Sequence, residues 1–77
     1  MEFKYIMFDD GLTEHPVMFA NHIAHSNMAF NLGVAGKPIS AGFVRFVNGK
    51  LEAYGESISL KLTSRREDTA IINKNIG

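Results

Sequence analysis

The sequence predicts an α+β fold: an antiparallel sheet of about four strands, made of two hairpins, with two short helices packed on one face. Three observations support this class. Asn48-Gly49 lies between two β-prone segments and supplies the two positive-φ residues that a type I′ turn needs. An aromatic-rich segment that ends in Asp9-Asp10-Gly11 predicts another hairpin. Two further segments have apolar residues at helical spacing behind helix-start residues.

The N-terminal hairpin consists of residues 3–8 and 13–19. Apolar side chains alternate to both faces of the segment 3–8, so this strand is either central in the sheet or covered by a partner. Pro16 has no amide hydrogen to donate, which predicts an edge position for the second strand.

The first helix is predicted over residues 21–32. Asn21 can cap its start, and Gly33 is well placed as the left-handed residue that ends it. His22 and His25 then lie on the polar side of this helix.

The second hairpin pairs residues 40–47 with residues 50–57 around Asn48-Gly49. Gly55 predicts a bulge or bend, beyond which the strand alternation resumes as far as Leu62. Ser64-Arg65-Arg66-Glu67 matches a capping box, in which the serine and glutamate side chains bond each other's free backbone amides. It predicts a final helix at 65–75. The apolar residues expected to be buried there are Ala70, Ile72, and Ile76 or the adjacent Ile71.

Length and composition indicate one small domain, residues 1–77. Because 45% of the residues are hydrophobic and the interior is small, some apolar surface is expected to meet another copy, which predicts a homo-oligomer. A net charge of zero gives no overall field that would attract nucleic acid or an anionic membrane. The chain has no cysteine and no apolar run of about 20 residues, so a cytoplasmic protein without a membrane span is expected.

An anion site is predicted where extended hydroxyl-bearing residues meet the start of the final helix. Free backbone amides and arginine side chains favour phosphate or carboxylate groups at such a position. The alternative is that Ser64 only caps the helix while the arginines pair with Glu67, Asp68 or Glu56 on the surface. The residues predicted to bind the ligand are Arg65, Arg66, Ser64, Ser57, Ser59 and Lys37.

Another backbone or a flat ligand could also approach Phe43, because Gly42 beside it has no side chain, although a tight strand start explains this glycine equally well. No glycine-rich phosphate loop and no cofactor motif is present, so no cofactor is predicted.

Metal or acid–base chemistry is the competing hypothesis. His22 and His25 are three residues apart and could share a metal on one helix face, and Asp9 and Asp10 are paired carboxylates at a strand end. Two histidines at this spacing are common, however, and Asp-Asp-Gly is also an ordinary turn sequence. No metal site is therefore predicted.

The segment Gly55-Glu56-Ser57-Ile58-Ser59-Leu60, the following 64–68, the opening 4–11 and the loop 37–43 together resemble small proteins of tailed phages and prophages. The resemblance implies a phage accessory protein in the host cytoplasm, where compact oligomeric inhibitors of host defence are a recurring role. It carries over no functional residue.

We therefore expect a small, non-enzymatic, oligomeric binding protein. It would antagonise host defence by sequestering an anionic, nucleotide-like ligand or by masking a host protein. A small metal-dependent or acid–base enzyme that uses His22, His25, Asp9 and Asp10 is one alternative, and a virion or assembly component is another.

Overall fold

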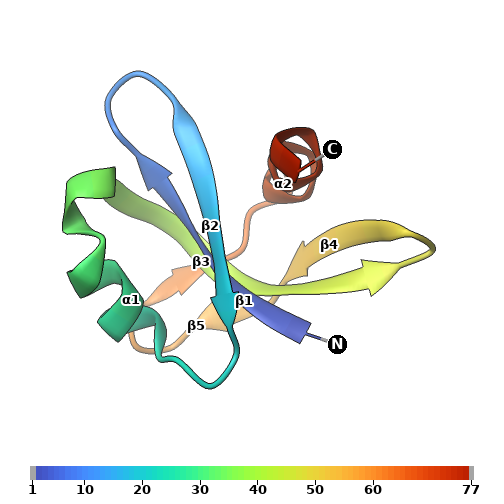
Figure 1. Ribbon diagram of the computed structural model, residues 1–77, viewed down its shortest axis with the longest axis horizontal. Helices are drawn as coiled ribbons and strands as arrows, with labels where there is room; N and C mark the ends of the chain where they lie inside the picture. The colour runs from blue at the N-terminus through green and yellow to red at the C-terminus, as the bar shows by residue number, and fades with distance from the viewer. Residues whose placement is uncertain (1, 77) are drawn as a thin grey trace.

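The computed structural model describes residues 2–76, apart from the side chains of Val34 and Ile76. It has an α+β fold with an antiparallel four-stranded sheet and two α-helices, which confirms the predicted class (Figure 1). In chain order the elements are β1 (Glu2–Asp9), β2 (Glu14–Ala20), α1 (His25–Asn31), a 3-10 turn (Gly33–Ala35), β3 (Lys37–Val47), β4 (Lys50–Tyr54), β5 (Glu56–Ser57), β6 (Leu62–Thr63) and α2 (Asp68–Ile76).

The main sheet has the strand order β2-β1-β3-β4. β2 lies at one edge, as Pro16 predicts. Asn48 and Gly49 have φ angles of 52° and 80°, as a type I′ turn requires, and this turn sets a register in which Phe43 pairs with Tyr54. The predicted second hairpin is therefore present.

Gly55 breaks the strand after β4, as predicted, with a φ of 76°. Beyond it the chain does not continue as one strand to Leu62. Residues 58–61 form a tight turn with Lys61 at a φ of 56°, and β5 and β6 pair as a short separate hairpin. The apolar alternation of this stretch is thus divided between two short strands.

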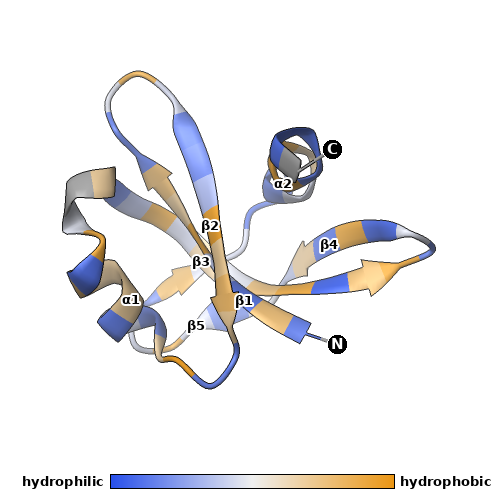
Figure 2. Cartoon of the chain, in the orientation of Figure 1, coloured by the Kyte–Doolittle hydropathy of each residue, from blue (hydrophilic) through white to orange (hydrophobic). Residues whose placement is uncertain are grey.

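The two helices cover opposite faces of the sheet, so the prediction that both pack on one face is wrong. Tyr5 and Met7 of β1 share a core cluster with Ile72 of α2. The alternate residues Ile6 and Phe8 belong to a second cluster, which includes residues of α1 and β6. Figure 2 shows hydrophobic residues along β1, with α1 and α2 on either side of it. A strand that is apolar on both faces needs a cover on each.

The central strand is fully covered within one chain. Residues 5–8 have no exposed surface at all. The two apolar faces of β1 are one reason to expect a homo-oligomer from the sequence. Because both faces are buried within a single chain, they no longer support that expectation. The large apolar side chains that stay exposed among the described residues lie in turns, on α1 and at the end of β3: Leu12, Phe30, Phe46, Val47 and Ile58.

The helix α1 begins at His25, later than predicted, and its N-cap is Ala24, which makes no side-chain capping bond. Residues 21–23 form a turn instead, because the Ile23 amide donates to the carbonyl of Ala20, and the Lys4 ammonium donates to the carbonyl of Ile23. Asn21 is therefore not a cap. Gly33 does not take the predicted left-handed conformation either, since the chain passes from α1 into the 3-10 turn.

The helix α2 buries Ile72 completely and Ile71 in part, in agreement with the sequence, whereas Ala70 is exposed. The predicted burial of Ile76 lies outside the described side chains. Within residues 2–76, neither helix has the length and apolar character needed to cross a membrane.

The outer edge of β4 is covered by polar side chains of α2. The Asn73 carboxamide accepts the Leu51 amide at 3.1 Å and donates to the Leu51 carbonyl at 2.7 Å, as a neighbouring strand would. Thr69 Oγ1 accepts the Ala53 amide at 3.0 Å. These bonds fasten the helix to the sheet and occupy backbone groups that another chain could otherwise pair with.

We predict that Asn73→Ala lowers the free energy of unfolding by about 1–3 kcal/mol, because it leaves backbone groups of Leu51 without partners. It should also increase aggregation, since the β4 edge becomes available. Urea unfolding and light scattering measure the two effects. Asn75→Ala is the control, because Asn75 bonds only the carbonyl of Ile71 on the exposed side of the same helix. Equal behaviour of the two variants would contradict a role for Asn73 at the edge.

Candidate functional site

The segment predicted to bind an anion lies ahead of α2, but it does not form the predicted capping box. Ser64 Oγ donates to the carbonyl of Gly55 at 2.9 Å, away from the helix start. α2 begins at Asp68, and the Asp68 carboxylate accepts the Arg65 amide at 3.0 Å. The carboxylate that holds the start of the helix is therefore one residue further along than the predicted Glu67.

Arg65 forms ion pairs within its own chain. Its Nη2 donates to Glu14 Oε1 on β2 at 2.7 Å, and its Nε donates to Asp68 Oδ1 at 3.0 Å. The hydrogen bond to Glu14 is the main reason that the pKa of Arg65 is raised. A ligand anion at Arg65 would have to displace these two carboxylates, so the geometry does not favour the predicted anion site.

Asp68 is the buried centre of this network. It has no exposed surface, and Tyr5 Oη donates to Asp68 Oδ2 at 2.5 Å. Burial alone would raise the pKa of Asp68, but the Ser40 hydroxyl, the Tyr5 hydroxyl and the N–H groups of Arg65 outweigh it and hold the pKa below its usual value. Burial, and then Asp68, raise the pKa of Tyr5. Ser40 Oγ faces this site but makes no hydrogen bond of good geometry to any described residue.

The other predicted ligand residues are not gathered in one place. Ser57 is buried and accepts the Leu60 amide at 3.2 Å, which stabilises the β5–β6 turn. Lys37 is exposed at the start of β3, and Arg66 is exposed ahead of α2. Ser59 alone lines a pocket, described below. A ligand at these residues stays a prediction.

The residues of the competing hypothesis are also separated. Asp9 accepts the Gly11 amide and Asp10 accepts the amides of Leu12 and Thr13, as in an ordinary turn. The amide of Thr13 is the main reason that the pKa of Asp10 is lowered.

His22 lies in the turn before α1 and His25 is its first residue, so the two do not share a helix face as predicted. Among the described residues, no three His, Asp or Glu side chains are placed to hold a metal ion.

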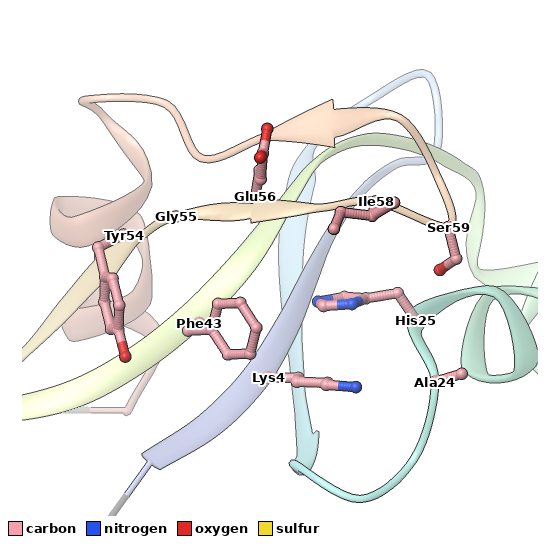
Figure 3. Close-up of a pocket in the computed structure, with 9 residues that line it drawn as sticks. All are labelled: Lys4, Ala24, His25, Phe43, Tyr54, Gly55, Glu56, Ile58 and Ser59. Atoms are coloured by element: carbon pink, nitrogen blue, oxygen red, sulfur yellow. The ribbon is translucent and has the colours of Figure 1, made fainter.

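A pocket of about 500 Å³ opens at the end of the sheet face that α1 covers. It lies between β1, β3, the β4–β5 bend, the turn after β5 and the start of α1 (Figure 3). Its volume is within the range of small-molecule sites, about 300–1,000 Å³. The residues that line it are Lys4, Ala24, His25, Phe43, Tyr54, Gly55, Glu56, Ile58 and Ser59.

Aromatic rings form one wall of this pocket. Phe43 lies between Tyr54 and His25 in Figure 3, with ring centroids 5.8 Å from each. The Phe43 and Tyr54 rings are tilted by only 34°, and the Arg45 guanidinium lies 4.3 Å from the centroid of the Tyr54 ring. Gly55 allows this arrangement, because a Cβ there would come within 3.1 Å of the Phe43 ring.

His25 is the buried end of the aromatic wall, with 4% of its surface exposed. Its Nε2 lies 2.8 Å from the carbonyl oxygen of Gly42, and the edges of Phe19 and Phe43 contact its ring. Burial lowers the pKa of His25, and the positive charge of Lys4 lowers it further. His25 is therefore neutral at pH 7.

Lys4 brings a positive charge into the pocket. Its Nζ donates to the carbonyl of Ile23 at 2.9 Å in a partly buried setting. Among the described residues, no carboxylate lies within ion-pair distance of it. The carboxylate of Glu56, which also lines the pocket, points away from the Phe43 ring in Figure 3.

Sequence reasoning offers another backbone or a flat ligand as the neighbour that Gly42 admits beside Phe43, and the backbone of Tyr54 lies against Gly42. It misses Lys4, His25 and Tyr54 as neighbours of Phe43 in the pocket. The pairing of Phe43 with Tyr54 could have been found, because a two-residue turn at Asn48-Gly49 fixes the register. The positions of Lys4 and His25 in the pocket could not have been found from the sequence, since only the tertiary fold brings β1 and α1 together.

The chain matches no protein-family model, and no curated protein or solved structure is significantly similar to it. The resemblance to phage and prophage proteins therefore stays a prediction. The function has to be inferred from the pocket itself.

Arg65 and Arg66 offer a matched pair of variants. We predict that Arg65→Ala lowers the free energy of unfolding by about 3–5 kcal/mol, because it leaves the buried Asp68 carboxylate without its cation. Arg66→Ala should change it by less than about 0.5 kcal/mol, as expected for an exposed side chain. Urea unfolding monitored by circular dichroism compares the two. Similar losses would show that the buried ion pair does not hold α2 in place.

The lowered pKa of Asp68 predicts an acid-sensitive fold. A carboxyl group whose pKa is lower in the folded state stabilises the fold above its unfolded pKa, about 3.9, and this contribution is lost as the pH falls through the folded value. The difference in free energy of unfolding between the parent protein and Asp68→Asn should therefore be largest at pH 7 and should decrease below pH ~4. Unfolding at pH 7, 5 and 3 measures it.

Glu52→Gln is the control for the pH series, because it removes an exposed ion pair with Arg45. Such a pair contributes about 0–1 kcal/mol. If the difference in free energy of unfolding between the parent protein and Asp68→Asn stayed constant down to pH 3, the carboxylate charge would not stabilise the fold.

Proposed function

We propose that this chain is a non-enzymatic binding protein that sequesters a small planar anion, a nucleotide-like ligand, in the pocket beside Phe43. The observation that supports this most directly is the Lys4 ammonium group. It is partly buried beside an aromatic wall and has a single hydrogen-bond acceptor, the carbonyl of Ile23, among the described residues.

An unpaired ammonium group in such a place favours an anionic ligand. Removal of a charge from water is unfavourable unless the charge is paired and hydrogen-bonded. With one N–H of Lys4 directed to Ile23, the others are free to donate to a phosphate or carboxylate group. A cationic ligand would meet repulsion from the same group.

The aromatic wall favours a ligand that is flat. Phe43 and Tyr54 are both partly exposed, and their adjacent rings, tilted by 34°, offer apolar surface to a planar partner. Stacking of a nucleic-acid base on an aromatic side chain contributes about 1–3 kcal/mol. A ring against Phe43 with an acidic substituent near Lys4 would use both features of the pocket.

Catalysis has less support than binding. The hydroxyl groups that line the pocket belong to Tyr54 and Ser59, and neither is hydrogen-bonded to a His, Asp or Glu side chain among the described residues. Nucleophilic catalysis needs a base within hydrogen-bond reach of the hydroxyl group. Ser59 Oγ instead accepts the amide of Ser26 at 3.2 Å.

A homo-oligomer, the masking of a host protein, a virion or assembly role and a cytoplasmic location remain separate predictions. Sequestration of a small ligand does not require any of them. Native mass spectrometry of the protein purified from cells would test the oligomer and detect a retained ligand in one measurement.

We predict that adenosine 5′-monophosphate, used as a probe, binds the protein and that Lys4→Met weakens this binding by about tenfold or more, because a charge-assisted hydrogen bond is lost. Adenosine, which has no phosphate, should bind both proteins equally. Methionine keeps most of the apolar length of the lysine stem, so the pocket wall is retained. Isothermal titration calorimetry gives the affinities.

Lys37→Met is the control, because Lys37 is exposed at the start of β3 and does not line the pocket. It should leave both affinities unchanged. If Lys37→Met weakened binding and Lys4→Met did not, the ligand would lie at the site predicted from the sequence. If neither adenosine 5′-monophosphate nor adenosine bound, the proposal would fail.

A further inference from the structure

The tautomer of His25 is fixed by its backbone partner. The carbonyl oxygen of Gly42 can only accept a hydrogen bond, so the His25 Nε2, 2.8 Å away, must carry the proton. Because the ring is neutral at pH 7, the other nitrogen, Nδ1, has a free lone pair. His25 therefore presents a hydrogen-bond acceptor whose identity is set by the fold.

The lone pair on Nδ1 is not used by a described hydrogen bond of the protein. No described residue donates a hydrogen bond to it, and the hydrogen bond of this ring to the protein goes through Nε2. His25 lines the pocket although only 4% of its surface is exposed, so the pocket is the side from which a ligand would approach this ring.

The position of this acceptor is also fixed. The Phe19 ring meets the His25 ring at 84° and the Phe43 ring meets it at 87°, so edge contacts hold the imidazole on two sides. Together with the bond to Gly42, they leave the ring little freedom to rotate. A group held in this way can discriminate between ligands without loss of side-chain entropy on binding.

We propose that His25 Nδ1 selects the ligand by accepting a hydrogen bond from an N–H group on the edge of its planar ring. The ligand class is then a heteroaromatic anion with an amino or ring N–H group, such as an amino-purine nucleotide. This inference rests on the proposed function, since it assumes that a planar anion occupies the pocket.

The charged groups around the pocket fit this division of roles. Lys4 on β1 can donate to the acidic group of the ligand, and it cannot accept a hydrogen bond. Glu56 on β5 is exposed, and its carboxylate points away from Phe43 in Figure 3. The Tyr54 and Ser59 hydroxyl groups also line the pocket, but they can donate as well as accept, whereas His25 Nδ1 in this tautomer can only accept. A ligand N–H group that lacked this partner would be buried unsatisfied.

The experiment compares two probes that differ in one amino group. Adenosine 5′-monophosphate has a 6-amino group, whereas purine riboside 5′-monophosphate has hydrogen there and offers no N–H from its ring. We expect the parent protein to bind the first about tenfold or more tightly than the second, as judged by calorimetry at pH 7.5. Equal affinities would overturn the role of His25 and leave the proposed function intact.

Variants of His25 assign the discrimination to this residue. His25→Phe keeps an aromatic ring without the lone pair, and it should reduce the affinity ratio of the two probes to about one. His25→Gln can donate to Gly42 and still provide an acceptor, so it should restore part of the ratio. Lys4→Met should weaken both probes by the same factor and leave the ratio unchanged.

The outcomes separate the two proposals. A ratio that survives in a folded His25→Phe protein would overturn the role of His25. If this variant failed to fold, the affinities of the two probes for the parent protein would still test the role of His25. If neither probe bound the parent protein, the proposed function would fail and this inference with it.

Discussion

The buried carboxylate of Asp68 is the constraint on which the rest of this structure depends. An ionised carboxylate without exposed surface is tolerated only when it is paired and hydrogen-bonded. Its partners come from three elements: Tyr5 on β1, Arg65 before α2 and, through Arg65, Glu14 on β2. Satisfying this one group therefore fixes α2 across the central and edge strands.

The position of α2 decides where a ligand site can form. α2 closes the face of the sheet that carries Tyr5 and Met7, and its Asn73 covers the edge of β4. The opposite face is covered by α1 and the β5–β6 hairpin, and this cover does not extend over the parts of β3 and β4 that line the pocket. The rings of Phe43 and Tyr54 are left partly exposed there. The pocket is thus the part of the second face that the short elements of the chain do not reach.

The sequence predicts the elements whose formation is local. The Asn48-Gly49 turn, the edge position of β2 and the break at Gly55 follow from backbone chemistry, and each is present. Features that depend on distant partners are predicted poorly. α1 begins later than predicted, and the turn before it bonds Lys4, far away in the sequence, through the carbonyl of Ile23.

The same reason explains the errors in the candidate site. In the sequence, Arg65 is either a ligand cation or a partner of a nearby carboxylate such as Asp68; the structure shows the pairing with Asp68 and adds Glu14 from β2. Lys4 looks like an ordinary strand residue, yet it is the ammonium group that lines the pocket. The neighbouring Asp68 indicates the pairing of Arg65, but only the tertiary structure brings Glu14 to Arg65 and places Lys4 in the pocket without a carboxylate among the described residues.

The long separation between Tyr5 and Asp68, 63 residues, has a consequence for the order of folding. Hairpins close within about 1–10 μs because their contacts are local, whereas contacts between distant residues carry a larger entropic cost and form more slowly. We expect the two local hairpins to form first, and the distant contacts, β1 with β3 and Tyr5 with Asp68, to form later. The pocket is lined by residues of both β1 and β3 and by no residue of α2. A ligand that binds there would therefore hold together one of the late contacts, and its binding would draw the unfinished chain toward the native state.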